Sequence, residues 1–400
     1  MHRYRSLAAC LLAVTMTLTA CAVPTSRDNV EATAELVRPR FRASIEWRRD
    51  RAADESARAR AAELLNGDLT LEAAVGVAFL VNPSLQVALE QLAISRSRLV
   101  AAITPPNPVG VIGSRKPGGD LAAFYPQSAV SIGVLMNVMA LFTMPDRVAI
   151  ATLDLQRARY ATAQVAVDHA AHVVQAWLDY SAAQQTWLRY QSAEVGSFEA
   201  NEAISAELNA ATARAKLGEL MGVAGWRDDW KVSVRLPAAP ASDPDPAELE
   251  VAAMTQRLDL LAAAKAVDVR LRTLAMQRRF RWLNQLDFGL FRDKAIGGTS
   301  FTGPNAVIEI PLFDQRVAQL LESDGELHVA VRQLEAAQIA ARTEIRIHVA
   351  ELKAMRQQLQ MFEGPTAAGD PRYDAVLLEY WRARSALALA AGDWAAVSGL

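Results

Sequence analysis

Alternating apolar and polar residues mark four short stretches of the chain. Between residues 128 and 141, the apolar members of the alternation are Val130, Ile132, Val134 and Met136. A period of two residues is typical of a β-strand with two unlike faces. We expect strands at 108–116, 128–141, 285–292 and 305–312.

Longer stretches with the apolar spacing of helices separate these strands. They are rich in alanine, leucine and arginine, which favour helix formation. We expect helices at 84–103, 147–193, 198–221, 258–283, 315–362 and 373–391. The fold class is therefore predicted to be mainly α with a small β part.

The predicted strands have one apolar face and one face of small or polar residues, as transmembrane β-strands do. A soluble sheet that packs one face on a helical core has the same pattern. Gly-rich polar loops at 115–127 and 293–305 join the strands in pairs, which favours the transmembrane interpretation. On the polar face, Asp287 and Glu309 are candidates for a barrel lumen. Four strands cannot close a membrane barrel, because the smallest barrels have about eight, so several chains would have to combine their strands.

The order of elements occurs twice, which indicates a duplicated unit. Five landmarks recur at offsets between 169 and 177 residues. The pairs are Asn82 with Arg257, Asn107 with Asn284, Asp146 with Gln315, Gly196 with Gly369, and Gly222 with Gly392. A connector at 235–248, rich in proline and aspartate, lies between the repeats, which we assign to 69–236 and 237–400.

A strand is predicted to pass directly into a long helix once in each repeat. In the second repeat, Pro311 ends the strand because proline cannot donate a ladder hydrogen bond, and Asp314 is a suitable N-cap. Pro145 and Asp146 stand in the same order in the first repeat. We expect no loop at either junction.

Helix lengths predict which helices lie end to end. The long helix that starts at residue 147 would span about 73 Å, and 198–222 and 258–283 together about 76 Å. We therefore expect these two helices to stack on each other. By the same argument, 373–391 should stack on 84–103.

The N-terminus has the pattern of an export signal. A basic start precedes an apolar run at 7–20, which is too short for a helix that spans a bilayer. The residues "LTAC" at 18–21 resemble a lipobox, so we predict a lipoprotein signal peptide at 1–20, acylation of Cys21 and an anchored segment at 21–68. Cys10 would be removed, so no disulfide within the mature chain is expected. Cleavage of an ordinary signal peptide nearby is the alternative.

Composition and motifs argue against several classes of function. The net charge is −2 and 22% of residues are charged, which gives no reason to expect a nucleic-acid partner. No P-loop, HExxH, CxxC or GxSxG motif is present, so we expect neither an enzyme nor a cofactor. His169 and His172 lie near Asp168 on a helix, but no third metal ligand is visible, and a packed or solvated face explains them better.

This organisation resembles the outer-membrane efflux protein family, the TolC-type channels. The stretches that carry the resemblance are 69–102, "IEIPLFDQRVAQ" at 308–319, 189–223 and 373–394. Their order, the duplication and the lipobox are specific together, although each is weak alone. Both helical hairpins are shorter than is usual in the family by several heptads.

The resemblance implies a homotrimer in which each chain adds four transmembrane strands to a twelve-stranded barrel. The helical hairpins would form an all-α tunnel across the periplasm, shorter than is usual. It also implies a periplasmic adaptor and an inner-membrane pump as partners, and a place in the outer membrane with the lipid on Cys21.

In this family the periplasmic turns of the hairpins close the tunnel and contact the adaptor. By position, the candidates are Glu194, Gly196, Ser197, Glu199, Asp370, Arg372, Tyr373 and Asp374. Several of these are good N-cap types, so helix capping is the alternative. The function implied is a passive exit duct for efflux or secretion; the alternative is a lipid-anchored periplasmic scaffold that does not conduct.

Overall fold

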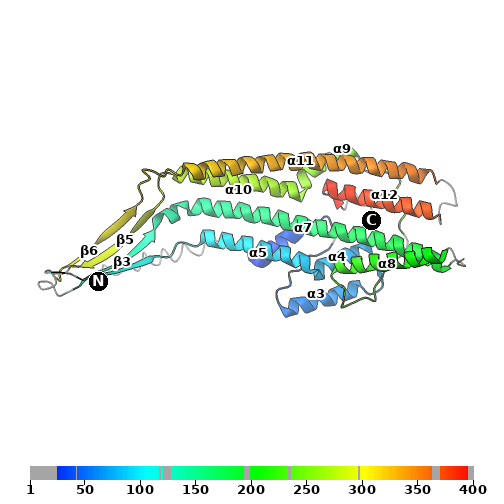
Figure 1. The fold of residues 1–400 in the computed structure, drawn as a ribbon, viewed down its shortest axis with the longest axis horizontal. Coiled ribbons are helices and arrows are strands. Elements are labelled where there is room, and N and C mark those ends of the chain that lie inside the picture. Colours follow the sequence, from blue (N-terminus) through cyan, green and yellow to red (C-terminus); the bar gives the residue numbers. More distant parts are fainter. Residues whose placement is uncertain are drawn as a thin grey trace.

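The molecule is elongated, with long helices along its axis and a small sheet at one end (Figure 1). The computed structural model describes residues 25–41, 43–116, 119, 128–192, 199–232, 236–295, 298–362 and 370–394. The predicted signal peptide, the lipidation site Cys21 and the hairpin-turn residues Glu194, Gly196 and Ser197 lie outside these residues.

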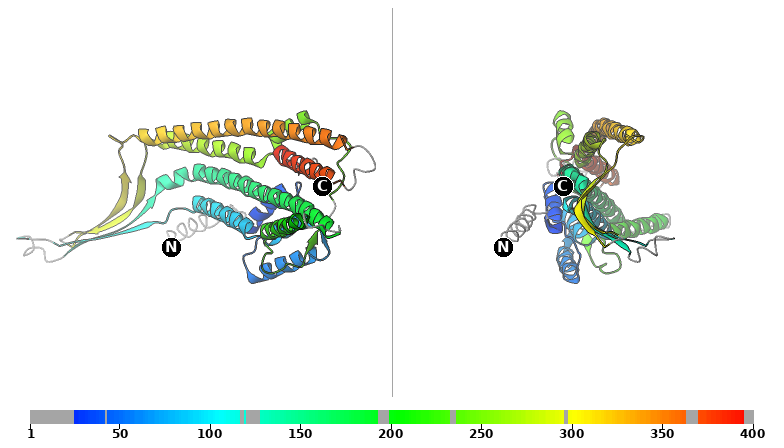
Figure 2. Two further views of the ribbon diagram at one scale, coloured as in Figure 1. Left: turned by 45° about the vertical axis from the view of Figure 1, so that its right-hand side comes forward. Right: turned by 90° about the vertical axis from the view of Figure 1, so that its left-hand side faces the viewer.

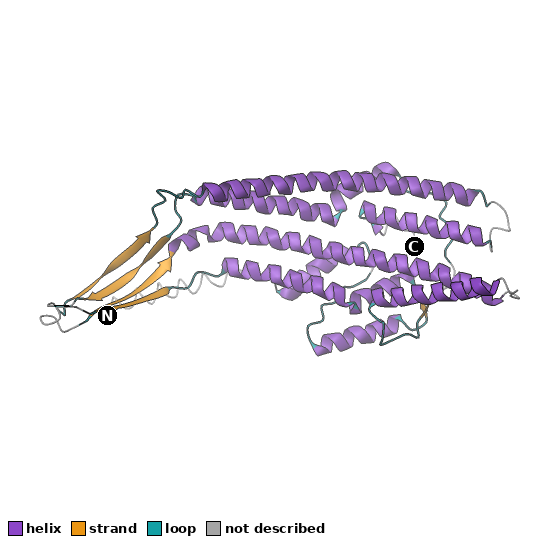
Figure 3. Cartoon of the chain, in the orientation of Figure 1, coloured by secondary structure: helices purple, strands orange, loops and turns teal. Residues whose placement is uncertain are grey.

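Two long helices form the frame, and four shorter ones lie beside them; Figure 3 shows this arrangement. The long helices are α7 (Val138–Ser192) and α11 (Val317–Gln360). The shorter ones are α5 (Pro83–Ile103), α8 (Glu199–Met221), α10 (Leu258–Phe280) and α12 (Pro371–Ala391). The predicted helices are thus confirmed, with shifts at their ends.

Further short elements surround the middle of the frame, where α3 stands off to one side (Figures 1 and 2). They are α2 (Ser26–Val37), α3 (Arg51–Leu64), α4 (Leu71–Val81), α9 (Pro246–Gln256), and the parallel pair β1 (Asp68–Leu69) and β4 (Lys231–Val232). In the described part of the chain, no single helix is long and apolar enough to cross a membrane, although α4 and α5, bent by 52°, meet that test together.

The sheet at the end of the frame is antiparallel, in the order β2-β3-β5-β6. The strands are β2 (Val109–Arg115), β3 (Ala129–Asn137), β5 (Leu286–Lys294) and β6 (Ser300–Ile308). β3 pairs with β5, so the sheet joins the two repeats.

The alternation along the strands produces two unlike faces. Val134 and Leu290 are cross-strand partners and are 53% and 63% exposed. Gly133, one position away, is buried and lies opposite Phe291. A Cβ at Gly133 would lie 2.7 Å from that ring, so only glycine fits there. One face therefore carries exposed apolar side chains, and the other carries a mixture of small, polar and larger residues.

The last strand begins and ends earlier than predicted. β6 covers Ser300–Ile308 instead of 305–312 and includes Pro304, opposite Leu290. β6 has an open edge within this chain, and proline is tolerated on an edge strand because its missing donor breaks no ladder there.

The first strand–helix junction has no loop, but the helix starts nine residues before the predicted position, so Pro145 and Asp146 do not mark its start. α7 follows β3 directly, and the Asn137 side chain caps it by accepting the Ala140 N–H at 2.7 Å. Pro145 lies inside α7. The prediction was wrong because a proline inside a helix removes one backbone hydrogen bond, here the one to the Leu141 carbonyl, and need not end the helix. Arg147 Nη2 donates to the Ala140 carbonyl at 2.7 Å in that turn.

The second junction does contain a loop, so the prediction there was also wrong. Residues 309–316 separate β6 from α11, and the N-cap is Arg316, with a left-handed φ of 58° and no side-chain cap. The Asp314 carboxylate instead accepts the Arg316 N–H at 2.8 Å. Pro311 interrupts the backbone donors of this loop and restricts Ile310 to extended conformations, so the chain cannot turn at once into a helix.

The predicted end-to-end stacking of helices was wrong in its pairing. α8 meets α5, and α12 meets α10, each within its own repeat. The Asn82 amide, which precedes α5, donates to the Leu220 carbonyl at 2.7 Å. Arg257, which precedes α10, donates to the Ala390 carbonyl at 3.2 Å. Helix length matched either pairing, so length could not decide between them.

The two joints have the same backbone design. Asn82 has φ −69° and ψ 126°, and Arg257 has φ −63° and ψ 124°. Opposite each stands a glycine with positive φ, Gly222 at 75° and Gly392 at 73°. A Cβ on Gly222 would lie 2.8 Å from the Asn82 Cα, so the close contact itself requires glycine. The hydrophobic core surrounds these joints and includes the buried side chains of Phe79, Trp230, Tyr380 and Trp381.

Candidate functional site

The end of α7 and the start of α12 approach each other at the end of the molecule remote from the sheet (Figure 1). Asp374, on the first turn of α12, accepts a hydrogen bond from Gln185 Nε2 at 3.0 Å. It also forms an ion pair with Arg189. Asp374 therefore links the two hairpins to each other, which is more than helix capping.

A second ion pair joins the same two helices. Arg382 Nε donates to the Asp179 carboxylate at 3.1 Å, and Arg382 also pairs with Glu379 on its own helix. Burial lowers the pKa of Arg382, but the hydrogen bond and charge of Asp179 outweigh this and raise it. The guanidinium stays charged, so the pair is maintained across the physiological pH range.

Between these contacts lies a cavity of about 500 Å³. Its lining includes Arg189, Gln185 and Asp374 together with alanines of α7 and α12. The two helices are thus held by polar contacts around a gap and are not closely packed there. Such an arrangement can separate at small cost in apolar contact area.

The other described candidates at this end bond within their own hairpin. Asp370 is the N-cap of α12: it accepts the Arg372 N–H at 2.8 Å and pairs with the Arg372 side chain at 3.1 Å. The hydrogen bond from the Arg372 side chain lowers the pKa of Asp370, and the charge of Arg189 on α7 also helps to lower it. Tyr373 packs edge to face on Phe362, with ring centres 6.0 Å apart. Glu199 begins α8.

At the sheet end, Asp146 has a different role from the predicted cap. Its carboxylate pairs with Arg279 of α10 at 2.9 Å, and only 13% of its side chain is exposed. Asp146 therefore ties the first turns of α7 to the second repeat. Pro311 and Asp314 lie in the loop 309–316 described above.

The two lumen candidates lie on the same side of the sheet. Asp287 is the cross-strand partner of Asn137 and Val307, and it accepts a hydrogen bond from Gln285. Glu309 follows β6 and continues the register of Val307, with its N–H bonded to the Gln285 carbonyl at 3.2 Å. The open apolar face that carries Val134 and Leu290 is the opposite one, because side chains alternate along a strand.

The ring of His169 forms a hydrogen bond with the backbone. Its Nε2 lies 2.9 Å from the Leu220 carbonyl, next to the first joint. Burial lowers the pKa of His169, so the ring is neutral at physiological pH. Among the residues that the structure describes, no group of three or more His, Cys, Asp or Glu side chains is placed to hold a metal ion.

The connector between the repeats is bound by a charged cluster that the sequence did not reveal. Asp243 accepts hydrogen bonds from Arg356 of α11 at 2.6 Å and from the Tyr380 hydroxyl of α12 at 3.0 Å, and it pairs with Arg384 at 3.3 Å. The Trp381 indole donates to the Pro237 carbonyl at 2.8 Å. The connector is therefore part of the folded second repeat.

Sequence reasoning missed the partners of Asp374 because they lie far from it in the chain. Gln185 and Asp374 are separated by 189 residues, and Arg382 and Asp179 by 203. No local motif marks Gln185, Arg189, Asp179 or Arg382. Only residues of opposite charge at similar distances from the hairpin turns of α7 and α12 could have suggested the contact.

Solved structures with this architecture are outer-membrane channels and related membrane proteins. A membrane protein from Pseudomonas aeruginosa is 16% identical, with a TM-score of 0.62 over 80% of this chain and 92% of its own. CusC, described as forming a transmembrane channel, is 13% identical, with a TM-score of 0.60 over 81% and 92%. The Neisseria gonorrhoeae MtrE outer membrane channel is 14% identical, with a TM-score of 0.58 over 81% and 89%.

The relationship is visible in structure and not in sequence. No family model matches the chain, and no curated protein matches it either. The similarity extends over most of this chain and most of each of these structures. This chain therefore has the fold of the TolC-type outer-membrane channels.

Proposed function

We propose that this protein is the outer-membrane exit duct of an efflux or secretion system. It acts as a passive conduit, and a periplasmic adaptor and an inner-membrane pump supply substrate and energy. The observation that carries the proposal is the sheet at the end of the helical hairpins, with one open apolar face and two open edges. An apolar face of this kind fits the lipid of a bilayer.

The open edges of the sheet argue for assembly of several copies. Within the described residues, β2 and β6 each have one unpaired edge, and backbone groups cannot stay unpaired in lipid. We infer that β6 of one copy pairs with β2 of the next. Three copies with four strands each give the twelve-stranded barrel of a homotrimer.

Exposed apolar residues on the frame helices favour the same assembly. On α5, Val87 and Ile94 are 58% and 57% exposed, and on α11, Leu321 and Ile339 are 68% and 65% exposed. In a trimer these faces would lie between copies, where each buried side chain contributes roughly 1–2 kcal/mol. The helices of three copies would then enclose a tunnel that continues the barrel.

The polar side of the sheet would line the pore. Asp287 and Glu309 would face water there, where carboxylates need no partner. The conduit needs no catalytic group, because the substrate moves through water and the pump selects it. The acyl chain on Cys21 would add a second attachment to the outer membrane.

The contacts of Asp374 would hold the periplasmic end narrow, and the adaptor would bind near them. Each partly buried charged contact contributes about 1 kcal/mol. If three copies open together, their three Asp374–Arg189 ion pairs favour the closed state by ~3 kcal/mol, which is about 100-fold.

The proposal is tested with purified full-length protein in detergent and in planar bilayers. We expect the mass of a trimer and stepwise single-channel currents. A monomer in detergent that gives no currents would contradict the duct, and would favour the alternative of a periplasmic scaffold.

The closure is tested with a matched pair of variants at the start of α12. Asp374→Asn should raise the open fraction of the channel by about tenfold or more, because it weakens the link to α7. Asp370→Asn mainly alters the local pair with Arg372 and forms no direct bond to α7, so it should change the currents much less than Asp374→Asn. Equal effects of the two variants would show that Asp374 acts only through its own helix.

A further inference from the structure

One segment that occurs once in the chain contacts both repeats. It joins α2 to α3 and covers residues 38–50, of which residue 42 lies outside the described part; we call it the crossing segment. Its described residues form no strand, and three of its side-chain hydrogen bonds reach backbone carbonyls beside the helix joints. A segment without a counterpart in the duplication is placed to bind the two repeats to each other.

In the second repeat the crossing segment binds the α10–α12 joint through Arg40. Its Nη2 donates to the Gln256 carbonyl at 2.5 Å, and its Nε donates to the Gly392 carbonyl at 3.0 Å. Its third nitrogen, Nη1, donates to the Leu36 carbonyl of α2 at 2.5 Å. One planar guanidinium thus joins α2, the end of α9 and the end of α12.

In the first repeat the crossing segment binds the end of α4, next to the α5–α8 joint, through Arg48. Arg48 Nη2 donates to the Val81 carbonyl at 2.8 Å. The Gln86 side chain accepts the Arg48 N–H at 2.9 Å and donates to the Glu46 carbonyl at 2.8 Å. These bonds hold the segment along the first turns of α5.

The two carbonyls that the arginines bind are equivalent positions of the duplication. Val81 is the last residue of α4 and Gln256 the last residue of α9. Each precedes an extended N-cap, Asn82 or Arg257, and the same 175-residue offset relates both pairs. The crossing segment therefore holds the same feature of each repeat at its two ends.

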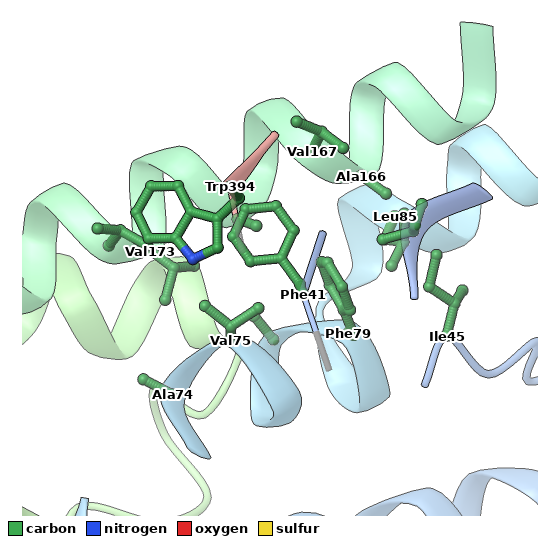
Figure 4. Close-up of a cluster of buried hydrophobic side chains, with 14 of the residues drawn as sticks. Phe41, Ile45, Ala74, Val75, Phe79, Leu85, Ala166, Val167, Val173 and Trp394 are labelled. Atoms are coloured by element: carbon green, nitrogen blue, oxygen red, sulfur yellow. The ribbon is translucent and has the colours of Figure 1, made fainter. Parts of the chain in front are cut away.

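Between the arginines, Phe41 adds an apolar contact to both repeats. It stacks on Trp394 of the second repeat, with ring centres 5.1 Å apart, and packs edge to face on Phe79 of the first at 6.2 Å (Figure 4). Phe41 is 5% exposed and Trp394 8%. Phe41 therefore contacts both repeats at a point between the two arginine contacts.

We propose that Arg40 and Arg48 are positioning residues that set the angle between the two repeats, and thereby the separation of their hairpin ends. α12 spans about 32 Å, so a rotation of about 10° at its joint moves its far end by ~5 Å. That distance is enough to separate Asp374 from Arg189. The link to channel opening rests on the proposed function, whereas the link to hairpin separation does not.

The test measures the separation of the hairpin ends directly. Spin labels are attached at Asn201→Cys on α8 and Arg372→Cys on α12, and labelled chains are diluted with unlabelled ones. Double electron–electron resonance then reports one distance within a chain. Arg40→Gln should broaden this distance or lengthen it by about 5 Å, and Arg40→Lys should restore it in part because an ammonium still donates to carbonyls.

Amide hydrogen exchange identifies the joint that loosens. Arg40→Gln should speed exchange about tenfold at the ends of α9 and α12 and leave α4 and α5 unchanged, and Arg48→Gln should do the reverse. Arg38→Gln is the matched control: it lies in the same segment, but it pairs with exposed Glu31 and Glu35 of its own helix and should change neither readout.

The proposal would be overturned by an unchanged distance in both Gln variants, or by faster exchange spread evenly over both repeats. A wild-type protein that carries no current would contradict the proposed function. It would leave this inference intact, because neither the spin-label distance nor the rate of amide exchange depends on conduction.

Discussion

Gly222→Ala tests the helix joints most directly, because a second glycine nearby supplies the control. Gly222 directly follows α8 and has φ 75°. A Cβ there would lie 2.8 Å from the Asn82 Cα and 3.1 Å from the Asn82 nitrogen. Gly225, three residues on, has φ 85° and nothing within 4 Å of a Cβ. The backbone is in the left-handed conformation at both positions, but only at Gly222 would a side chain also clash with neighbouring backbone atoms.

The expected losses in the free energy of unfolding follow from backbone strain and from steric crowding. An alanine held at positive φ costs about 1–2 kcal/mol at either position. Crowding against backbone that cannot move aside costs about 1–3 kcal/mol more at Gly222. Gly222→Ala should therefore lower the free energy of unfolding by about 2–5 kcal/mol, and Gly225→Ala by about 1–2 kcal/mol.

The equivalent glycine of the second joint provides an intermediate case. A Cβ at Gly392 would lie 3.2 Å from the Arg257 nitrogen, a looser contact than at Gly222. Guanidinium unfolding in mild detergent, followed by circular dichroism, should give the order of loss Gly222, Gly392, Gly225. A loss at Gly225 as large as that at Gly222 would refute the reasoning, because the backbone strain is common to both.

Three further predictions concern the connector, the sheet and the anchor. Burial acts to raise the pKa of Asp243, but the hydrogen bonds from Arg356 and Tyr380 and the nearby positive charges outweigh it and hold the pKa below its usual 3.8. A lowered pKa stabilises the fold above the unfolded-state pKa, so Asp243→Asn should cost about 2 kcal/mol at pH 7 and progressively less as the pH falls below about 4, measured by denaturant unfolding across pH. Ile132→Lys on the apolar face should cost about 2–4 kcal/mol of stability in lipid vesicles, whereas Ser131→Lys on the opposite face should be tolerated; equal costs would mean that neither face contacts lipid. Cys21→Ala should abolish labelling of cells with radioactive palmitate, and label that persists would contradict the lipobox.

The periodic parts of the structure could be predicted from the sequence. Helix α5 was expected at 84–103 and lies at Pro83–Ile103, because a capping Asn82 and a proline at the first position mark its start locally. The faces of β3 were predictable because the side chains of a strand alternate whatever lies around it. The recurrence of Gly222 and Gly392 was also visible, since positive φ restricts those positions to few residue types.

The strand–helix junctions were less predictable because proline can occur both inside a helix and in a loop. Pro145 and Pro311 stand in similar sequence, yet the first lies inside a helix and the second in a loop. The difference lies at the starts of the two helices: the Asn137 side chain caps α7 eight residues before Pro145, whereas α11 has no side-chain cap. No pattern of apolar residues reports where such a cap acts.

The sequence by itself determined the elements, the duplication and the two faces of the sheet, because these depend on neighbouring residues and on a short period. Only the tertiary structure decided that α8 meets α5, that Asp374 reaches α7, and that Arg40 and Arg48 bind equivalent carbonyls of the two repeats. Such contacts join residues far apart in the chain, and a hydrogen bond to a backbone carbonyl leaves no mark on the identity of the residue that accepts it.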